Sequence, residues 1–131
     1  MVVATDAPML PHQLSRLAKR AALGLARTGS IGANGSGELM IAFSTAHRSA
    51  DNTQAVTRQV TALADGGYRD SAFNPVFEAA IEAVEESVVN ALFMAETTTG
   101  RDGHVLHALP VDRTLDMLER AGRIAKWHRS I

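Results

Sequence analysis

Residues 28–46 read TGSIGANGSGELMIAFSTA, and this stretch decides the fold because a glycine-rich loop runs directly into an apolar strand. The loop, residues 29–37, contains four glycines together with Ser30 and Ser36. That composition favours a tight turn in which backbone N–H groups can approach a ligand closely. Residues 38–45 are mostly apolar and include β-branched and aromatic side chains, as is typical of a buried strand. We therefore expect the rest of the chain to be arranged around this loop and this strand.

Ser36 and Glu38 flank one glycine at the point where the loop becomes the strand. Because they are two residues apart on an extended backbone, their side chains are expected to point to the same face. A hydroxyl and a carboxylate held side by side can pass a proton or bind an amine. The same pattern also fits a turn serine next to a solvated glutamate, since loops often have this composition. The residues alone leave both interpretations open.

Composition places the chain among ordinary globular proteins of one domain or one subunit. It has 131 residues, is 46% hydrophobic and 21% charged, and carries a formal net charge of −1. Nucleic-acid binding normally needs a basic surplus, so we expect no nucleic-acid partner. The absence of cysteine excludes disulfides, thiol nucleophiles and thiolate metal sites, and it fits a reducing, cytoplasmic location. No apolar run of about 18 residues occurs, so no membrane partner is expected.

The chain opens abruptly on residues 1–5, MVVAT, which are predicted to form a short apolar strand. Natural domains usually begin with a polar lead-in, so this start suggests a piece cut from something longer. A helix is expected over residues 10–26, with Pro11 in its first turn and a regular apolar face. The other face carries a small basic group that includes Arg16 and Arg20, which fits a solvated surface better than an anion site.

The longest expected element is a helix over residues 73–97, with Asn74 as its N-cap ahead of Pro75. Glu85 and Glu86 lie about 100° apart around this helix, so they make a poor two-carboxylate site. The other expected elements are a strand near residues 56–62, a loop over 97–103 with a turn at Asp102-Gly103, a strand at 105–106, a helix over 112–120, and a docking tail or frayed end over 123–131.

In chain order, this pattern is that of an α+β protein in which helices are layered on sheet. The strands are too few and too closely joined for a doubly wound sheet. We expect a single domain portion over residues 1–131, with any tail confined to 123–131. The long apolar helix face and the abrupt start both suggest that a partner chain completes the sheets.

The sequence alone contains no complete catalytic or metal site. His104 and His107 would fall on opposite faces of a strand, and a metal site needs a third ligand, so we expect neither metal nor cofactor. His12 and His47 have no obvious acid partner. The G-x-S-x-G nucleophile elbow is absent, and the glycine loop lacks the lysine of a phosphate-binding loop. A small-ligand binder built on the glycine loop is an alternative that rests on composition alone.

Four stretches of the sequence together resemble the C-terminal β subunit of the DmpA family. This family comprises the L-aminopeptidase/D-amidase/D-esterases and the β-peptidyl aminopeptidases, which are serine peptidases of family S58. The resemblance covers nearly all of residues 1–122. It is carried by the stretches VVATDAPMLPHQLSRLAKRAALGLARTGS, NGSGELMIAFSTA, FEAAIEAVEESVVNALFMAETTTGRDGH and HALP.

The resemblance implies a precursor that cleaves itself into an α chain and a smaller β chain. The new β chain begins with a serine whose hydroxyl is the nucleophile and whose α-amine can act as base. The implied fold is a layered αββα sandwich that resembles the N-terminal-nucleophile hydrolases, with different strand connectivity. The serine and glutamate of the family's S-G-E motif assist the nucleophile, and they fall on Ser36 and Glu38. The implied substrates are small peptides, amides or esters, which lose an N-terminal residue through an acyl-enzyme.

The chain departs from the family pattern at its start. The family's serine stands just ahead of VVATDAP, whereas this sequence begins with Met1 inside that strand, so residues 1–131 lack the nucleophile. The oxyanion asparagine and the acid that holds the substrate amine belong to the α subunit, which is the expected partner. The family tends to form higher assemblies, so we expect a homo-oligomer of αβ units. The rival prediction is a catalytically dead orphan fragment that acts as a structural or self-associating module. A smaller departure is His47, where the family often has asparagine.

Overall fold

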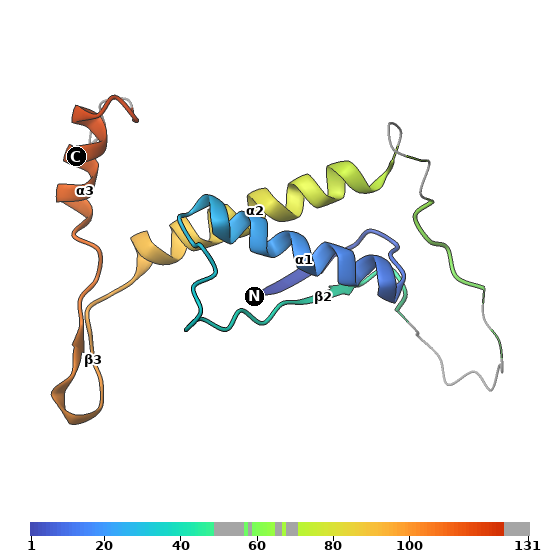
Figure 1. The fold of residues 1–131 in the computed structure, drawn as a ribbon, viewed down its shortest axis with the longest axis horizontal. Helices are drawn as coiled ribbons and strands as arrows, with labels where there is room; N and C mark the ends of the chain where they lie inside the picture. The colour runs from blue at the N-terminus through green and yellow to red at the C-terminus, as the bar shows by residue number, and fades with distance from the viewer. Residues whose placement is uncertain (49–56, 58, 65–66, 68–70, 125–131) are drawn as a thin grey trace. The chain divides into compact units, whose positions relative to one another are not determined.

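The computed structural model describes residues 1–48, 57, 59–64, 67 and 71–124 (Figure 1). Contacts within the chain group it into two compact units, Met1–Val88 and Val89–Ile131, and each is described by itself. The elements are β1 Val2–Thr5, α1 Pro11–Arg27, β2 Ile41–Ser44, α2 Phe73–Met94, β3 Thr98–Thr99, the 3-10 turn η1 Arg101–Gly103, β4 Val105–Leu106 and α3 Val111–Arg120.

The first unit is built on a pair of parallel strands joined by a helix. β1 and β2 pair in parallel, with Val2 opposite Ile41 and Thr5 opposite Ser44 (Figure 1). Parallel strands need a long crossover connection, and α1 with the glycine loop supplies it. The strand expected over residues 38–45 is therefore present but shorter, because regular pairing begins at Ile41.

The two faces of this small sheet have different surroundings. Directly paired residues share a face, and successive residues alternate between faces. Val3 and Ala42 point inward and pack against the core. Val2 and Ile41 point outward and are 68% and 61% exposed. The first unit therefore has helices on one side of its sheet and an uncovered apolar face on the other.

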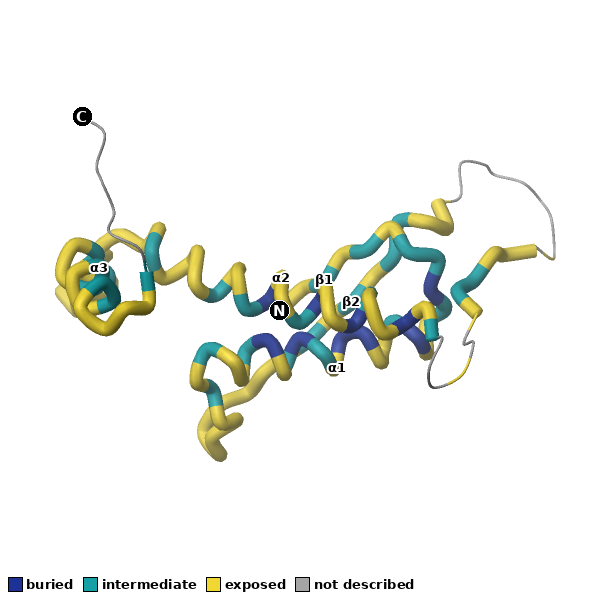
Figure 2. The backbone as a smooth tube through the Cα atoms, turned by 90° about the horizontal axis from the view of Figure 1, so that it is seen from above, coloured by how far each residue is buried: buried dark blue, intermediate teal, exposed yellow. Residues whose placement is uncertain are grey.

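The core of the first unit lies where α1, β1 and the first half of α2 meet. Figure 2 shows its buried residues gathered along α1 and the start of α2. The two helices approach closely at Gly24, because a Cβ there would collide with the Ile81 carbonyl and lie 2.8 Å from Val84 Cβ. The buried cluster consists of Met9, Leu17, Phe73, Phe77 and Ala80.

Two arginines of α1 that were expected on a solvated face lie over aromatic rings of α2. The Arg16 guanidinium is 5.1 Å from the centre of the Phe73 ring, and that of Arg20 is 4.2 Å from the centre of the Phe77 ring. A cation over an aromatic face is attracted by the ring quadrupole. Arg16 is nonetheless exposed and Arg20 is half-buried, so the predicted solvated face is confirmed for Arg16, and both guanidinium groups also cover aromatic rings at the edge of the core.

The second unit contains a short hairpin and a helix. β3 and β4 are antiparallel, and η1 turns the chain between them. The expected turn at Asp102-Gly103 is confirmed, because both residues have positive φ angles, 57° and 76°. The loop expected over residues 97–103 includes β3, which the sequence did not predict. Within the described residues, no helix is long and apolar enough to cross a membrane.

Two further expectations about the chain need correction. The strand predicted near residues 56–62 is absent from the described part of that range, and the other residues there lie outside the description. Next to this range, Leu63 contacts the core by single hydrogen bonds: Leu63 N–H donates to Pro8 O at 2.7 Å, and the buried Gln13 donates to Leu63 O at 3.0 Å.

Asn74 is not an N-cap, because α2 begins at Phe73. Most of the predicted tail, residues 125–131, lies outside the description.

Candidate active site

The glycine-rich loop between α1 and β2 takes its shape from local backbone conformation. Gly29 and Gly32 have φ angles of 104° and 60°, which L-residues with side chains rarely adopt. Gly32 N–H donates to the Ser30 hydroxyl at 3.3 Å. Further along, Ser36 N–H donates to Ala33 O at 2.8 Å and closes a tight turn. The loop thus has a defined path that delivers the chain to β2.

Ser36 and Glu38, the two residues singled out from the sequence, contact each other directly. The Ser36 hydroxyl donates to Glu38 Oε1 at 2.9 Å. It also lies 3.0 Å from Ala33 O, and because it has one proton it can donate to only one of these acceptors at a time. Both residues are exposed. The structure therefore contains an open hydroxyl–carboxylate pair whose proton has two alternative acceptors.

The start of β1 lies beside this pair. The Met1 amino group donates to Leu39 O at 2.6 Å, and Ile41 N–H donates to Met1 O at 3.0 Å. The parallel pairing thus continues to the first residue of the chain. If a preceding segment kept the same register, the residue one position ahead of Met1 would face Leu39. The residue two positions ahead would face Glu38.

The opposite ends of the two strands are tied together by hydroxyl groups that sequence reasoning missed. The Ser44 hydroxyl donates to Ala7 O at 2.6 Å, and the Thr5 hydroxyl accepts from Ala7 N–H at 3.1 Å. Thr45 N–H donates to Thr5 O at 2.9 Å. These bonds fix the position of β1 relative to β2. The only sequence signal for them is a run of Ser and Thr at the strand ends, which is common in turns.

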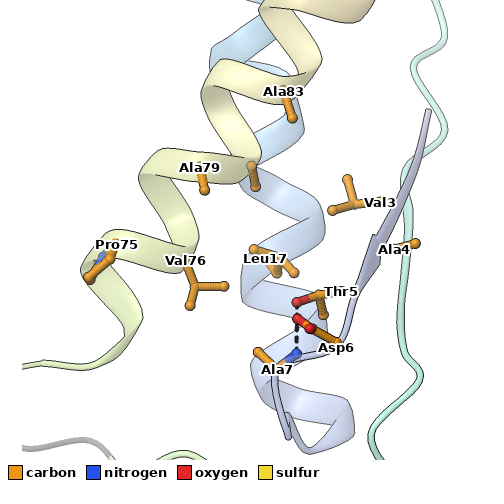
Figure 3. A pocket seen from close by; sticks show the side chains of 11 residues that line it. Val3, Ala4, Thr5, Asp6, Ala7, Leu17, Pro75, Val76, Ala79 and Ala83 are labelled. Carbon is orange, nitrogen blue, oxygen red and sulfur yellow. Dashed lines mark hydrogen bonds between the residues drawn. The ribbon is translucent and has the colours of Figure 1, made fainter.

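An apolar pocket of about 410 Å³ lies along β1, between this strand and the first half of α2 (Figure 3). In Figure 3, Val3 and Val76 extend toward this space from opposite walls, with Leu17 of α1 between them. In the described part of the chain, β1 pairs with β2 alone, so its other edge has no strand partner. The pocket therefore borders a free strand edge.

His47, on the connection after β2, bonds elsewhere and not to the Ser36–Glu38 pair. His47 Nε2 lies 2.6 Å from Thr61 O, beyond the carboxyl ends of the strands. The residues that the structure describes contain no group of three or more histidine, aspartate or glutamate side chains able to hold a metal ion. The chemistry available near the glycine loop is that of a hydroxyl, a carboxylate and backbone groups.

Comparison with known proteins identifies the family of the chain. The model of peptidase family S58 matches residues 1–106. The chain belongs to peptidase family S58. It is 44% identical, over 125 residues, to the β-peptidyl aminopeptidase BapA of Sphingosinicella microcystinivorans. That match covers 95% of this chain and 30% of the relative, so this S58 chain spans less than a third of that protein's length.

Solved structures show the fold of the S58 chain. The PH0078 protein of Pyrococcus horikoshii OT3 is 45% identical with a TM-score of 0.82, over 94% of this chain and 33% of that one. The L-aminopeptidase D-Ala-esterase/amidase of Ochrobactrum anthropi is 39% identical with a TM-score of 0.79, over 95% and 34%. The latter is described as a new variant of the Ntn-hydrolase fold. The predicted α+β fold of N-terminal-nucleophile-hydrolase type is confirmed.

Proposed function

We propose that this chain is the β-subunit-like portion of an S58 serine aminopeptidase. The complete enzyme would release N-terminal residues from small peptides, amides or esters through an acyl-enzyme. The observation that carries the proposal is the Ser36–Glu38 hydrogen bond beside the start of β1. Those residues match the S-G-E motif of the family, and the relatives named above include aminopeptidases. Residues 1–131 alone would then be inactive.

The strand register supports a specific place for a nucleophilic serine ahead of Met1. A residue two positions ahead of Met1 would face Glu38 if β1 continued in register. Its side chain would share a face with those of Met1 and Val3, because alternate residues of a strand point the same way. That face is the one that packs against the helices. A serine there would have its hydroxyl and its α-amine beside the Ser36–Glu38 pair.

The pair can assist such a nucleophile by holding and moving a proton. The serine Oγ would attack the substrate carbonyl carbon while its proton passes to the α-amine. The Ser36 hydroxyl has Ala33 O and Glu38 as acceptors in this chain, and in the complete enzyme it would donate to the attacking oxygen in place of one of them. Glu38 would orient the α-amine by accepting its N–H. The leaving amine would depart with the proton, and water would hydrolyse the resulting ester.

An α subunit from the same precursor is the partner that this arrangement favours. The outward face of the sheet, with Val2 and Ile41, is apolar and uncovered. Packing a second sheet on such a face is how a ββ sandwich buries it. The free edge of β1 beside the pocket of Figure 3 can pair with a further strand. We also propose that αβ units assemble further, supported by the exposed apolar side chains of α2.

Substitution of the pair in the complete enzyme tests this function. Ser36→Ala and Glu38→Gln should each lower kcat by at least about tenfold, since a group that transfers a proton contributes about 10²–10⁴-fold and a group that assists one contributes less. Ser87→Ala and Glu82→Gln are matched controls at exposed positions on α2, outside the glycine loop, and should leave kcat within about twofold. Circular dichroism would establish that all four variants fold. Unchanged kcat in the first two would overturn the assigned roles.

Intact mass and N-terminal sequencing of the protein from its source distinguish the proposed enzyme from the rival prediction, an orphan structural module. A chain that begins with serine two residues ahead of Met1 and co-purifies with a larger subunit would support the enzyme. A chain that begins at Met1 and has no partner would favour the orphan structural module.

A further inference from the structure

The glycine-rich loop presents an asparagine–glycine step at an exposed turn. Asn34 and Gly35 are the two central residues of the turn that is closed by the hydrogen bond from Ser36 N–H to Ala33 O at 2.8 Å. Both are exposed, and Asn34 is the one asparagine of the sequence that a glycine follows. We infer that Asn34 is a site of spontaneous deamidation, a covalent modification of the loop that holds the Ser36–Glu38 pair. This modification site does not depend on the proposed function.

The reaction joins the backbone nitrogen of Gly35 to the side chain of Asn34. Gly35 N loses its proton to water and attacks Asn34 Cγ, the bond from Cγ to Nδ2 breaks, and the side-chain nitrogen takes up a proton and leaves as ammonia. The product is a five-membered succinimide ring. Water then adds to one of the two ring carbonyls and opens the ring. Aspartate forms if the bond from Gly35 N to Cγ breaks, and isoaspartate forms if the bond from Gly35 N to the main-chain carbonyl carbon breaks.

The structure leaves both reacting groups of this step available. In the described part of the chain, no hydrogen bond holds the Asn34 side-chain amide or the Gly35 N–H. The bond that closes the turn uses the N–H of Ser36 instead. Gly35 has no side chain to shield its nitrogen, and a Cβ built there would meet no atom within 4 Å. Neither group therefore has to break a hydrogen bond within the described residues before it reacts.

The other described asparagines each lack one of these conditions. Asn74 precedes Pro75, whose nitrogen has no hydrogen to lose and cannot become the attacking group. Asn90 lies inside α2, where the N–H that follows it belongs to the hydrogen-bond ladder of the helix. The chain thus contains two internal controls for the reactivity of Asn34.

The modification would change the surroundings of the Ser36 hydroxyl. Ala33 O accepts the Ser36 N–H and also lies 3.0 Å from the Ser36 hydroxyl. Isoaspartate at position 34 adds one carbon to the main chain between these two residues, so the turn would lose its present hydrogen-bond geometry. The hydroxyl would then keep Glu38 Oε1, at 2.9 Å, as its acceptor. Both products also add a carboxylate to a loop that already contains Glu38, and like charges repel.

The test follows the folded chain over time at physiological temperature and mildly alkaline pH. Trypsin cleaves after lysine and arginine, so it releases Asn34 in the peptide 28–48 and both control asparagines in the peptide 70–101. Mass spectrometry detects the gain of one mass unit, isoaspartyl methyltransferase labels isoaspartate, and circular dichroism establishes that the chain stays folded. The synthetic peptide 28–48 is incubated in parallel as the unprotected reference.

Two glycine variants show whether the attack uses Gly35 N. Gly35→Ala places a methyl group beside the attacking nitrogen, and the backbone there lies outside the left-handed region, so the loop accepts alanine. Gly37→Ala is the matched control, because a Cβ there also meets no atom within 4 Å and the residue does not follow an asparagine.

In the folded parent chain, the peptide 28–48 should gain the mass unit and the isoaspartate label while the peptide 70–101 stays unchanged. Because exposed loops open at almost no cost in free energy, the rate in the folded chain should lie within about threefold of the rate in the synthetic peptide. Gly35→Ala should slow both signals, and Gly37→Ala should leave them unchanged. Conversion of the synthetic peptide without conversion of the folded chain would overturn the inference, because the loop would then protect Asn34. Equal rates in Gly35→Ala and the parent would overturn it too, because the attack would not pass through Gly35 N.

Discussion

The two halves of α2 carry the same apolar periodicity and meet different surroundings. In the first half, Phe73, Phe77 and Val84 are buried, and α1 packs against them. In the second half, Val89 and Leu92 are 43% and 52% exposed. Figure 2 shows the change along the helix, from buried residues near its start to exposed ones later. The apolar stripe marks the side of α2 that favours burial. Within the described residues, other side chains pack against the first half of this stripe and leave much of the second half exposed.

The same contrast separates the two faces of the β1–β2 sheet, of which one is packed and one is open. A chain that spans about 30% of its relative's length can bury only the surfaces that its own elements reach. The open surfaces are then where the proposed α subunit would contribute most. This comparison yields four predictions about the free energy of unfolding of the chain.

Phe73→Ala should have the largest effect. Phe73 is 1% exposed, stacks on Phe77 with ring centres 5.7 Å apart, and lies under the Arg16 guanidinium. Removing a buried aromatic side chain leaves a cavity and costs about 3–5 kcal/mol. Urea unfolding followed by circular dichroism would measure it. A loss below about 1 kcal/mol would mean that the first half of α2 is not packed as described.

Gly24→Ala tests how closely α1 approaches α2. The new Cβ would collide with the Ile81 carbonyl, which belongs to backbone and cannot rotate away. Such overpacking costs about 1–3 kcal/mol. Gly35→Ala is the matched control, because its Cβ would meet no atom within 4 Å. Equal unfolding free energies for the two variants would contradict the close crossing of the helices.

Arg20→Met tests whether the arginines stabilise the edge of the core. Methionine keeps an apolar stem and removes the charge that lies 4.2 Å from the centre of the Phe77 ring. The expected loss is about 0.5–1 kcal/mol, the range for a cation–aromatic contact near solvent. Arg113→Met, at an exposed position on α3, is the control and should change little. A neutral Arg20→Met would show that the contact contributes nothing to stability.

The sequence predicted what local periodicity and spacing determine. The apolar stripes predicted the bounds of α1 and α2 to within three residues at each end. The contact between Ser36 and Glu38 followed from the two-residue spacing of that pair. The parallel pairing of β1 with β2 and the arginines over the rings depend on which distant segments meet, and no local pattern records that. The strand expected near residues 56–62 failed for a related reason: β-branched residues favour a strand only where a partner strand is present, and the neighbouring Leu63 makes single bonds to Pro8 and Gln13 in place of a ladder.

The catalytic role that we propose for Ser36 and Glu38 could be predicted only through the family resemblance. The residues alone favour an ordinary turn serine beside a solvated glutamate over a functional pair. The register of β1 supports the role that we propose, because a residue two positions ahead of Met1 would face Glu38 if the strand continued in register. That relation joins residues about forty positions apart in the chain, so spacing between neighbours cannot reveal it.

Leu92→Ala should have the smallest effect in this chain and a larger one in the complete enzyme. Because Leu92 is 52% exposed here, its truncation should change the free energy of unfolding by less than about 0.5 kcal/mol. If the proposed assembly buries it, the same truncation should cost about 2 kcal/mol or more, as for a core leucine. Urea unfolding of both forms, with Phe73→Ala as the reference that is costly in each, gives the comparison. Equal small losses in the two forms would mean that the second half of α2 stays open to solvent, and its apolar stripe would then need another explanation than subunit assembly.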